Sequence, residues 1–448
     1  MIALGGSVMH HLALTLKEKG YHVTGSDDEI FDPAKTALEK AGLMPAEMGW
    51  FPERITGEID AVILGMHAKR DNPELRKAQQ LGIKVYSFPE YIFEQSKNKQ
   101  RIVIAGSHGK TTITAMVIHV LREVGRTFDF VVGASVDGFD NMVKLTNEAP
   151  IIVIEGDEYP SSALDSRPKF LNYHHHIGLI SGIAWDHINV YPDYDEYVRQ
   201  FDHFADASPK AGSLVFNEDD SVAAIICRKE RADVVQLEYS TPKHRVKGGK
   251  TFLDTPDGEI ELQVFGRHNM QNIAGAMRVC NRVGISDAQF YNAIQSFTGA
   301  ASRLETLAQG DSVTVFKDFA HAPSKVEATV RALSEQYPDR SLVAALELHT
   351  YSSLDKNYIE QYQGTLDVAA KAAVYYNREA AERKGREPLS EDTIKKAFGK
   401  QDLEVFTDAK ALEDWVKAQK GAQQNVALMS SANFNGMDVQ SIAEYLAG

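Results

Sequence analysis

The stretch Ala105-Gly106-Ser107-His108-Gly109-Lys110-Thr111-Thr112 lies between a short apolar run and a helical pattern, so it joins a buried strand to a helix. Its two glycines allow backbone N–H groups to turn toward a polyphosphate, and the ammonium group of Lys110 can reach the outer phosphates. The hydroxyl of Thr111 or of Thr112 can bind Mg²⁺. The residues from Gly106 to Thr112 are therefore predicted to bind a nucleoside triphosphate.

The spacing of this loop differs from the general pattern G-x-x-x-x-G-K-[ST]. The residue five positions before Gly109 is Ile104, and the loop reads Gly106-x-x-Gly109-Lys110 instead. A glycine-rich turn between a strand and a helix, with an exposed lysine, is the alternative interpretation. The other motifs of the chain must decide between these two interpretations.

The length and composition are those of an ordinary globular protein with several domains. The 448 residues are enough for about three domains, and 43% of them are hydrophobic while 25% are charged. The net charge of −14 opposes binding to nucleic acids and to acidic membranes, so we expect neither partner. We also predict no obligate protein partner.

The cysteines and the N-terminus indicate where the protein works. Cys227 and Cys280 are not spaced as CxxC, which argues against a disulfide framework and against a zinc site. The N-terminus lacks the pattern of a signal peptide, and no apolar run approaches the ~20 residues of a membrane span. We therefore expect a cytoplasmic protein.

The apolar runs indicate an α/β fold with three domains, 1–97, 98–297 and 298–448. A polar stretch at 95–101 marks the first boundary, and a motif at 297–303 marks the second. Turn signals at 248–249 and 256–258 indicate a small antiparallel excursion. The expected strands are 2–4, 21–24, 61–64 and 84–87, then 102–104, 151–154 and 177–180, then 312–316, 341–345, 372–375 and 426–429.

Carboxylates directly follow one of these buried strands. Glu155, Asp157 and Glu158 come after the run 151–154, and open α/β sheets bind ligands at the carboxyl ends of their strands. Because Mg²⁺ on a triphosphate takes one or two protein carboxylates, we expect a magnesium ligand here. A solvated strand end is the alternative. Asp186-His187 follows another apolar run, although a single histidine there is more often structural.

Two carboxamides share one face of an expected helix. Asn269 and Asn272 are three residues apart, and a carboxamide can both donate to and accept from a purine edge. A helix N-cap would explain one of them but not both. The pair is therefore a candidate base-binding site.

With these motifs in this order, the chain resembles the Mur ligases, ATP-dependent enzymes that form amide bonds in peptidoglycan metabolism. The resemblance covers essentially the whole chain, and the family's shortened phosphate loop, Gly-Thr-x-Gly-Lys-Thr-Thr, accounts for the unusual spacing at 106–112. It implies a Rossmann-like N-terminal domain for a UDP-sugar, a central P-loop domain for ATP and a Rossmann-like C-terminal domain for a peptide.

The resemblance also implies roles for individual residues in binding ATP and Mg²⁺. Glu155 and His187 match the ligands of two magnesium ions, with Thr111 as the hydroxyl ligand. The remaining nucleotide contacts would be Asn269 and Asn272 to adenine, Asp318 to the ribose and Arg303, in Phe297-x-Gly299-x-x-x-Arg303, to the γ-phosphate. Lys110, His187 and Arg303 are the residues expected to act in catalysis.

Within the family, the chain is most similar to members that recycle murein peptides, joining UDP-N-acetylmuramate to the tripeptide L-Ala-γ-D-Glu-meso-diaminopimelate. That similarity rests on Glu155-x-Asp157-Glu158-Tyr159, on Asp165-x-Arg167-x-Lys169-Phe170-x-x-Tyr173 and on the C-terminal loop 429–437. Members that add alanine usually have serine after the second glutamate, and they are the nearest alternative. A nucleotide-binding regulatory module without turnover is a further one.

The implied reaction passes the substrate carboxylate through an acyl phosphate, which an amine then attacks, so no protein nucleophile is required. A polyanionic peptide needs local donors in a chain of net charge −14, and strand ends of the third domain can provide them. The expected substrate residues are Gly5, Gly6, Ser7, Ser26, Asp27, His67 and Asn72 for the UDP-sugar, and His349, Tyr351, Ser352, Ser431 and Asn433 for the peptide.

Overall fold

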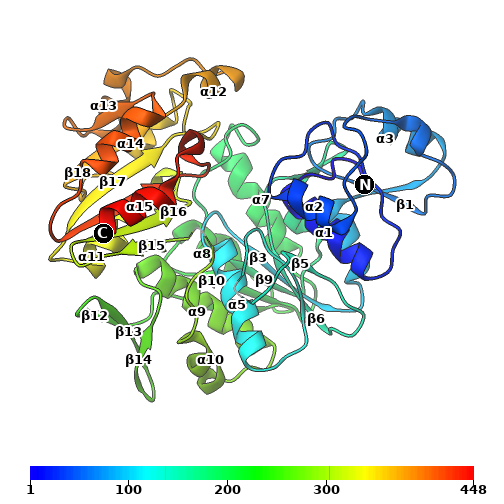
Figure 1. Cartoon of the computed structure of the whole chain (residues 1–448). Coiled ribbons are helices and arrows are strands. Elements are labelled where there is room, and N and C mark those ends of the chain that lie inside the picture. The colour runs from blue at the N-terminus through cyan, green and yellow to red at the C-terminus, as the bar shows by residue number, and fades with distance from the viewer. Residues whose placement is uncertain (137, 302) are drawn as a thin grey trace. The chain divides into compact units, whose positions relative to one another are not determined.

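The structure is a computed structural model of the chain, and it describes residues 1–136, 138–301 and 303–448 (Figure 1). Ser302, within the motif that the sequence places at the start of the third domain, lies outside the described residues. The chain forms two compact units. The first contains Met1–Ile183, Val198–Ser240 and Gly275–Ala293, and the second contains Ala184–Tyr197, Thr241–Ala274 and Ile294–Gly448.

The N-terminal part of the first unit has a small parallel sheet, in which β1 (Ala61–Leu64) pairs with β2 (Lys84–Ser87) as predicted. The prediction of strands at 2–4 and 21–24 is wrong, because Ile2 makes only isolated bridges to Leu64 and Ser26. Ala3 has a φ of 62°, so the backbone leaves the extended conformation directly after Ile2. Without a continuous neighbour, the segment 21–24 has no ladder to join.

Short helices accompany this sheet, and those at 73–80 and 88–95 contact β2. Ala13 of the first helix is buried together with Ala34 and Leu38 of the second. The elements are α1 (Ser7–Glu18), α2 (Ala34–Ala41), η1 (Pro52–Arg54), α3 (Pro73–Gln80) and α4 (Phe88–Gln95).

A seven-stranded sheet forms the core of the first unit, with the order β11-β10-β9-β3-β6-β4-β5. All of its pairings are parallel except that of β5 with β4. Residues 102–105 of the central strand β3 are fully buried, which explains their unbroken apolar pattern. The strands are β3 (Gln100–Ala105), β4 (Asp129–Val131), β5 (Val143–Lys144), β6 (Ile151–Glu155), β9 (Ile177–Ile180), β10 (Ser213–Asn217) and β11 (Val235–Tyr239).

Helix α5 (Lys110–Glu123, cyan in Figure 1) follows β3 and packs on β3 and β6. A two-stranded hairpin of β7 (Pro160–Ser162) and β8 (Asp165–Pro168) follows β6. The remaining helices of this part of the chain are α6 (Lys169–Asn172), α7 (Tyr194–Asp206), α8 (Ser221–Cys227), α9 (Arg267–Arg282) and α10 (Asp287–Ile294).

The second unit contains the predicted antiparallel excursion, formed by β12 (His244–Lys247), β13 (Lys250–Thr255) and β14 (Gly258–Leu262). Its main sheet has six strands in the order β15-β16-β20-β17-β18-β19, and only β15 is antiparallel. The strands are β15 (Glu305–Gln309), β16 (Val313–Asp318), β17 (Ser341–Glu347), β18 (Lys371–Tyr375), β19 (Glu404–Phe406) and β20 (Gln424–Met429).

Both faces of this six-stranded sheet are covered. Ala344 and Leu346 of β17 pack with α11 and α13 on one face, whereas Val343 and Ala345 pack with α14 and α15 on the other (Figure 1). The carboxyl ends of β16, β17 and β20 therefore meet at one open edge. The helices are α11 (Pro323–Gln336), η2 (Ile359–Tyr362), α12 (Arg378–Arg383), α13 (Glu391–Phe398), α14 (Ala409–Lys417), η3 (Phe434–Gly436) and α15 (Val439–Ala447).

The α/β class is confirmed. None of the helices in the described part of the chain combines the length and apolar character needed to cross a bilayer.

Candidate functional site

The loop after β3 is held tightly against the end of β9. Gly106 and Gly109 have φ values of 129° and 74°, a region that favours glycine. A Cβ atom on Gly106 would lie 2.1 Å from Oγ of Ser181. The N–H of Ser107 donates to the carbonyl oxygen of Gly182 at 2.9 Å. The loop backbone is therefore fixed between its own helix and a neighbouring strand.

Lys110, the first residue of α5, places its ammonium group inside this loop. Its Nζ donates to the carbonyl oxygen of Gly106 at 2.7 Å and to Oε2 of Glu158 at 2.6 Å. Burial lowers the pKa of Lys110, but the charges of Glu158 and Asp157 outweigh it, and the pKa lies above its ordinary value. Lys110 therefore carries a fixed positive charge.

Thr111 and Glu155 lie side by side at the same loop. Oγ1 of Thr111 donates to Oε1 of Glu155 at 2.8 Å, and the N–H of Gly133 donates to Oε2 of Glu155 at 2.7 Å. The sequence allows either Thr111 or Thr112 to be the metal ligand. In the structure it is Thr111 that contacts the carboxylate of Glu155.

This pair of hard oxygen donors fits Mg²⁺, which is usually bound by one or two protein carboxylates together with phosphate oxygens and water. In the described ranges, no group of three or more His, Cys, Asp and Glu side chains is arranged to hold a metal. A magnesium ion at Thr111 and Glu155 would therefore take its remaining ligands from the nucleotide and water.

Charged residues of the Asp157 and Asp165 motifs form two ion pairs, each between an aspartate and a basic residue. Nζ of Lys169 lies 2.6 Å from Oδ2 of Asp157, and this ion pair holds the pKa of Asp157 below its usual value although burial opposes it. Arg167 donates to both oxygens of Asp165, at 3.0 Å from Nε and 2.8 Å from Nη2. The two motifs thus form a local charge network around β8 and α6.

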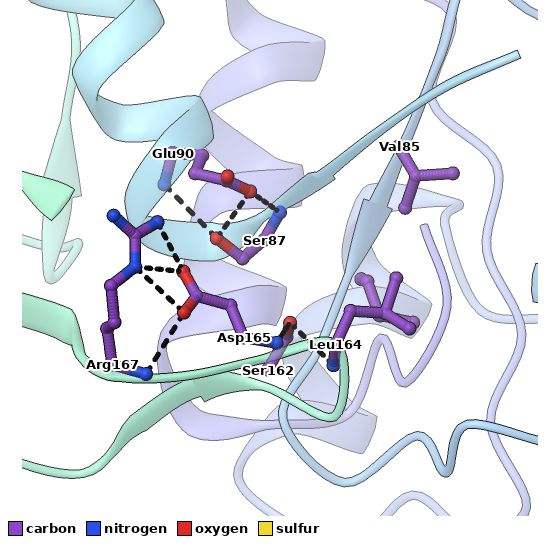
Figure 2. A pocket seen from close by; sticks show the side chains of 8 residues that line it. Val85, Ser87, Glu90, Ser162, Leu164, Asp165 and Arg167 are labelled. Atoms are coloured by element: carbon purple, nitrogen blue, oxygen red, sulfur yellow. Dashed lines mark hydrogen bonds and ion pairs between the residues drawn. The ribbon is translucent and has the colours of Figure 1, made fainter.

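A pocket of about 360 Å³ lies where this hairpin meets the carboxyl ends of β1 and β2 (Figure 2). Figure 2 shows the Arg167–Asp165 pair on one side of it and the apolar Val85 on the other. Glu90 accepts hydrogen bonds from the N–H and the hydroxyl of Ser87 at the rim. The lining is Leu64, Val85, Ser87, Glu90, Ser162, Leu164, Asp165 and Arg167. Such a mixed lining suits a hydroxylated ligand.

In the second unit, Asn269 and Asn272 lie on one face of α9, as predicted. Both are buried, and Nδ2 of Asn272 lies 3.5 Å from Oδ1 of Asn269. Nδ2 of Asn269 donates to the carbonyl oxygen of Phe265 at 2.9 Å. Neither is the helix N-cap, because α9 begins at Arg267.

Arg303 and Asp318 also belong to the second unit. The guanidinium carbon of Arg303 lies 4.3 Å from the ring centroid of Phe319. Asp318 accepts from the N–H of Ala320 at 2.8 Å and from Oγ1 of Thr329 at 3.2 Å, and burial raises its pKa. Each carboxylate oxygen has a second lone pair that a ribose hydroxyl can use.

Asp186 is the centre of a further charged cluster in the second unit. Nζ of Lys325 donates to Oδ2 of Asp186 at 3.0 Å, and Nε2 of His321 lies 3.9 Å from the same oxygen. Burial opposes the charge of Asp186, but Lys325, His187 and His321 hold its pKa well below the ordinary value. Glu155 belongs to the first unit, so a metal site that it shares with His187 remains a prediction.

Several residues predicted to bind the UDP-sugar have local partners. The N–H of Gly5 donates to Oδ2 of Asp27 at 2.6 Å, and the hydroxyl of Ser26 donates to the buried carboxylate of Glu74. Asn72 is the N-cap of α3 and accepts from two backbone N–H groups at 3.0 and 3.1 Å. These contacts give the residues structural roles, and binding of a substrate by the same residues stays a prediction.

The N-terminus of α1 is the more open part of that region. Gly6 is its N-cap and provides no side-chain cap, while Ser7 and His67 are exposed. Backbone N–H groups at a helix N-terminus favour an anion such as a diphosphate.

The predicted peptide residues after β17 lie beside a cation that the sequence did not identify. Nζ of Lys384, just after α12, donates to the carbonyl oxygen of His349 at 2.7 Å and lies 5.7 Å from the ring centroid of Tyr351. Burial lowers the pKa of Lys384. Ser352, in contrast, is buried and accepts from the N–H of Ile188 at 3.3 Å.

The loop after β20 is anchored by hydrogen bonds to Glu347. This buried carboxylate accepts from the hydroxyl of Ser430 and from the N–H of Phe434, the latter at 2.7 Å. Asn433 is exposed and caps η3, whereas Oγ of Ser431 is buried with no hydrogen-bond partner among the described residues. A buried hydroxyl without a partner indicates a group that a ligand can satisfy.

Sequence reasoning missed the partners of the predicted residues. Glu158 and Lys169 stand inside the quoted motifs, but no local spacing identifies which cation pairs with which carboxylate. Lys325 and Lys384 contact residues 139 and 35 positions away, respectively, and carry no local signal.

Comparisons with known proteins agree on one family. The description "Mur ligase family, catalytic domain" matches residues 1–100, and "Mur ligase middle domain" matches residues 104–280. The UDP-N-acetylmuramate–L-alanine ligase of Salinibacter ruber is 32% identical over 395 residues, 85% of this chain and 81% of that protein. The UDP-N-acetylmuramate–L-alanyl-γ-D-glutamyl-meso-2,6-diaminoheptandioate ligase of Escherichia coli is 30% identical over 342 residues, 74% of each chain.

Solved structures share the fold. A murein peptide ligase from Psychrobacter arcticus aligns with a TM-score of 0.67 and 22% identity, over 100% of this chain and 98% of that one. The MurF ligase of Thermotoga maritima, solved in complex with ADP, aligns with a TM-score of 0.63 and 13% identity, over 88% of this chain and 96% of that one. The expected three-domain fold is confirmed.

Replacing Lys110 by alanine should lower the rate of ATP-dependent ligation by about 10²- to 10³-fold, because one preorganised charge at the phosphates is lost. The melting temperature should also fall, since the buried carboxylate of Glu158 loses the cation that pairs with it. Ligation rates and thermal unfolding measure both effects. Lys97→Ala, which removes an exposed ion pair with Glu94, is the control and should change neither. Near-normal ligation by Lys110→Ala would remove this lysine from the site.

Gly106→Ala should abolish ADP binding and destabilise the protein by more than about 1 kcal/mol, because the new Cβ meets Ser181 in a left-handed backbone. Gly125→Ala is the matched control. Its φ is 74°, but no atom lies within 4 Å of the added Cβ. Calorimetric binding of ADP should therefore persist in Gly125→Ala, and equal binding by both variants would contradict the close packing of the loop.

Proposed function

This chain belongs to the Mur ligase family, and on that premise we propose that it joins UDP-N-acetylmuramate to the tripeptide L-Ala-γ-D-Glu-meso-diaminopimelate with hydrolysis of ATP. The observation that carries this proposal is that Lys110, Thr111 and Glu155 converge at the phosphate loop. We assign the UDP-sugar to residues 1–97, ATP to 98–297 and the peptide to 298–448.

Three sets of groups support the assignment of residues 98–297 to ATP. The loop N–H groups and Lys110 suit the phosphates, Thr111 and Glu155 suit Mg²⁺, and the carboxamides of α9 suit adenine. ADP in the related MurF ligase supports ATP as the nucleotide. Magnesium ions, with Thr111 and Glu155 as ligands of one and His187 as the proposed ligand of a second, would neutralise charge on the phosphate oxygens.

In the proposed reaction, the carboxylate of UDP-N-acetylmuramate attacks the γ-phosphorus of ATP, forming an acyl phosphate and releasing ADP. The amine of the peptide then attacks the acyl carbon, an amide bond forms and phosphate leaves. Both reactants of the first step are anions, so the chain must reduce their repulsion. Lys110 does this from the loop, and Arg303 does so from the C-terminal part of the chain.

The tripeptide is favoured over a free amino acid by the donors at the carboxyl ends of β17 and β20. Lys384 adds a positive charge beside His349 and Tyr351, and Ser431 has an unsatisfied hydroxyl. A substrate with several carboxylates gains more from these groups than alanine does. The pairing of Asp157 with Lys169 and of Asp165 with Arg167 accompanies the motifs that resemble the peptide-recycling members.

L-Alanine is the second candidate amine. The identity to the alanine ligase of Salinibacter ruber, 32%, is as high as that to the tripeptide ligase of Escherichia coli, 30%.

The two candidates differ in the mass of the product. With ATP, Mg²⁺ and UDP-N-acetylmuramate, we expect the tripeptide to be ligated and alanine not to be, as measured by mass spectrometry and phosphate release. Ligation of alanine alone would establish the second candidate. Phosphate release with neither amine would favour a regulatory module.

Replacing Ser431 and Asn433 together by alanine should raise the apparent KM for the tripeptide about tenfold and leave the KM for ATP unchanged. Each lost hydrogen bond contributes about 0.5–1.5 kcal/mol to binding at a site remote from the phosphates. The control is Ser441→Ala on α15. This change removes an exposed hydroxyl that donates a hydrogen bond to Asp438. An unchanged KM for the tripeptide in the double variant would place the peptide elsewhere.

A further inference from the structure

The loop lysine is held on two sides by groups of the chain itself. An ammonium group has three N–H donors. One donates to the carbonyl oxygen of Gly106 at 2.7 Å and a second to Oε2 of Glu158 at 2.6 Å. One donor is left for a phosphate oxygen, and its direction is set by the other two.

The three carboxylates after β6 have separate partners. Glu155 accepts from Thr111 and Gly133, and Asp157 pairs with Lys169. Glu158 is therefore the one among them that hydrogen-bonds to the loop lysine. Lys169 is the direct partner of Asp157, so Glu158 is the carboxylate in direct contact with Lys110, while Asp157 and Glu155 act on Lys110 through their charges.

Burial indicates that the pair persists when phosphate binds. The side chain of Glu158 is 0% exposed, and that of Lys110 is 14% exposed. Removing one member of a buried pair leaves an uncompensated charge, which is strongly unfavourable. A phosphate that pulled Lys110 away from Glu158 would create that situation, so phosphate binding at the third donor is the less costly arrangement.

We propose that Glu158 is a positioning residue for Lys110, which fixes the ammonium group so that a single N–H points to the transferred phosphate. The proposal rests on the ATP-dependent reaction described above. Its effect belongs to the transition state, because a preorganised donor stabilises developing charge without having to move. The competing possibility is a latch that the nucleotide must open.

The first test separates kcat from KM. Glu158→Gln keeps the shape and an acceptor but removes the attraction that fixes Lys110. We expect kcat to fall about tenfold with the KM for ATP unchanged or lower, and Glu158→Asp, which keeps the charge, to recover part of kcat. A kcat within twofold of wild type in Glu158→Gln, or a higher kcat with tighter ATP binding, would overturn the proposal, and the latter result would establish the latch.

The second test is a double-mutant cycle in ADP binding, measured by calorimetry, and it does not depend on ligation. With Lys110 present, the charge of Glu158 is compensated, so Glu158→Gln should change the Kd for ADP less than threefold. In the Lys110→Ala background the carboxylate has lost this cation and repels ADP, so the same change should tighten binding at least fivefold. Equal effects in both backgrounds would show that the two residues are uncoupled.

Asp157→Asn is the matched control, because it removes a neighbouring carboxylate that pairs with Lys169 instead. Because the direct partner of Asp157 is Lys169, the effect of this change on ADP binding should differ between the two backgrounds by much less than that of Glu158→Gln. The double variant Lys110→Ala/Glu158→Gln leaves no unpaired charge and keeps the cycle measurable if a single variant unfolds. Absence of ligation by the wild-type protein would refute the proposed function and leave the ADP cycle as an independent result.

Discussion

The close approach of the Gly106 backbone to the end of β9 is the constraint on which the nucleotide site depends. A side chain at this position would overlap Ser181, and the φ of 129° is accessible mainly to glycine. Because the loop is fixed there, α5 starts at Lys110, and the next residue, Thr111, faces Glu155 at the end of β6. One backbone contact thus sets the positions of a cation, a hydroxyl and a carboxylate.

Charge compensation organises the surroundings of this loop. Glu158 is buried and the adjacent Asp157 is partly exposed, and two neighbouring carboxylates are stabilised when each has its own cation. Lys110 and Lys169 meet that requirement at 2.6 Å each. The same rule operates in the second unit, where Lys325 pairs with the buried Asp186 at 3.0 Å. A protein with a net charge of −14 binds anions only where such local cations are concentrated.

The C-terminal sheet holds polar loops in place at its open edge. Glu347 anchors the loop after β20 through Ser430 and Phe434, which leaves Ser431 and Asn433 at the edge. Lys384 reaches the loop after β17 from the segment that follows α12. Family membership follows from the matched domains and the overall fold, and we propose that the choice between alanine and tripeptide depends on these edge residues. The similar identities of relatives of both kinds agree with that division.

The sequence alone determined the features that follow from local periodicity and from short motifs. It identified β1, β2 and β9 with their bounds, the buried strand and helix around the phosphate loop, and the shared helix face of Asn269 and Asn272, because these depend on spacing along one segment. It failed at 2–4 and 21–24, where apolar runs have no continuous neighbour, and it missed β15 and β19, which are short and lack a clear apolar pattern. Only the tertiary structure decided that Thr111 contacts Glu155, that Glu158 pairs with Lys110 and that Lys384 lies beside His349. The physical reason is that ion pairing depends on distances between side chains far apart in the chain, and those distances are set by strand order and packing.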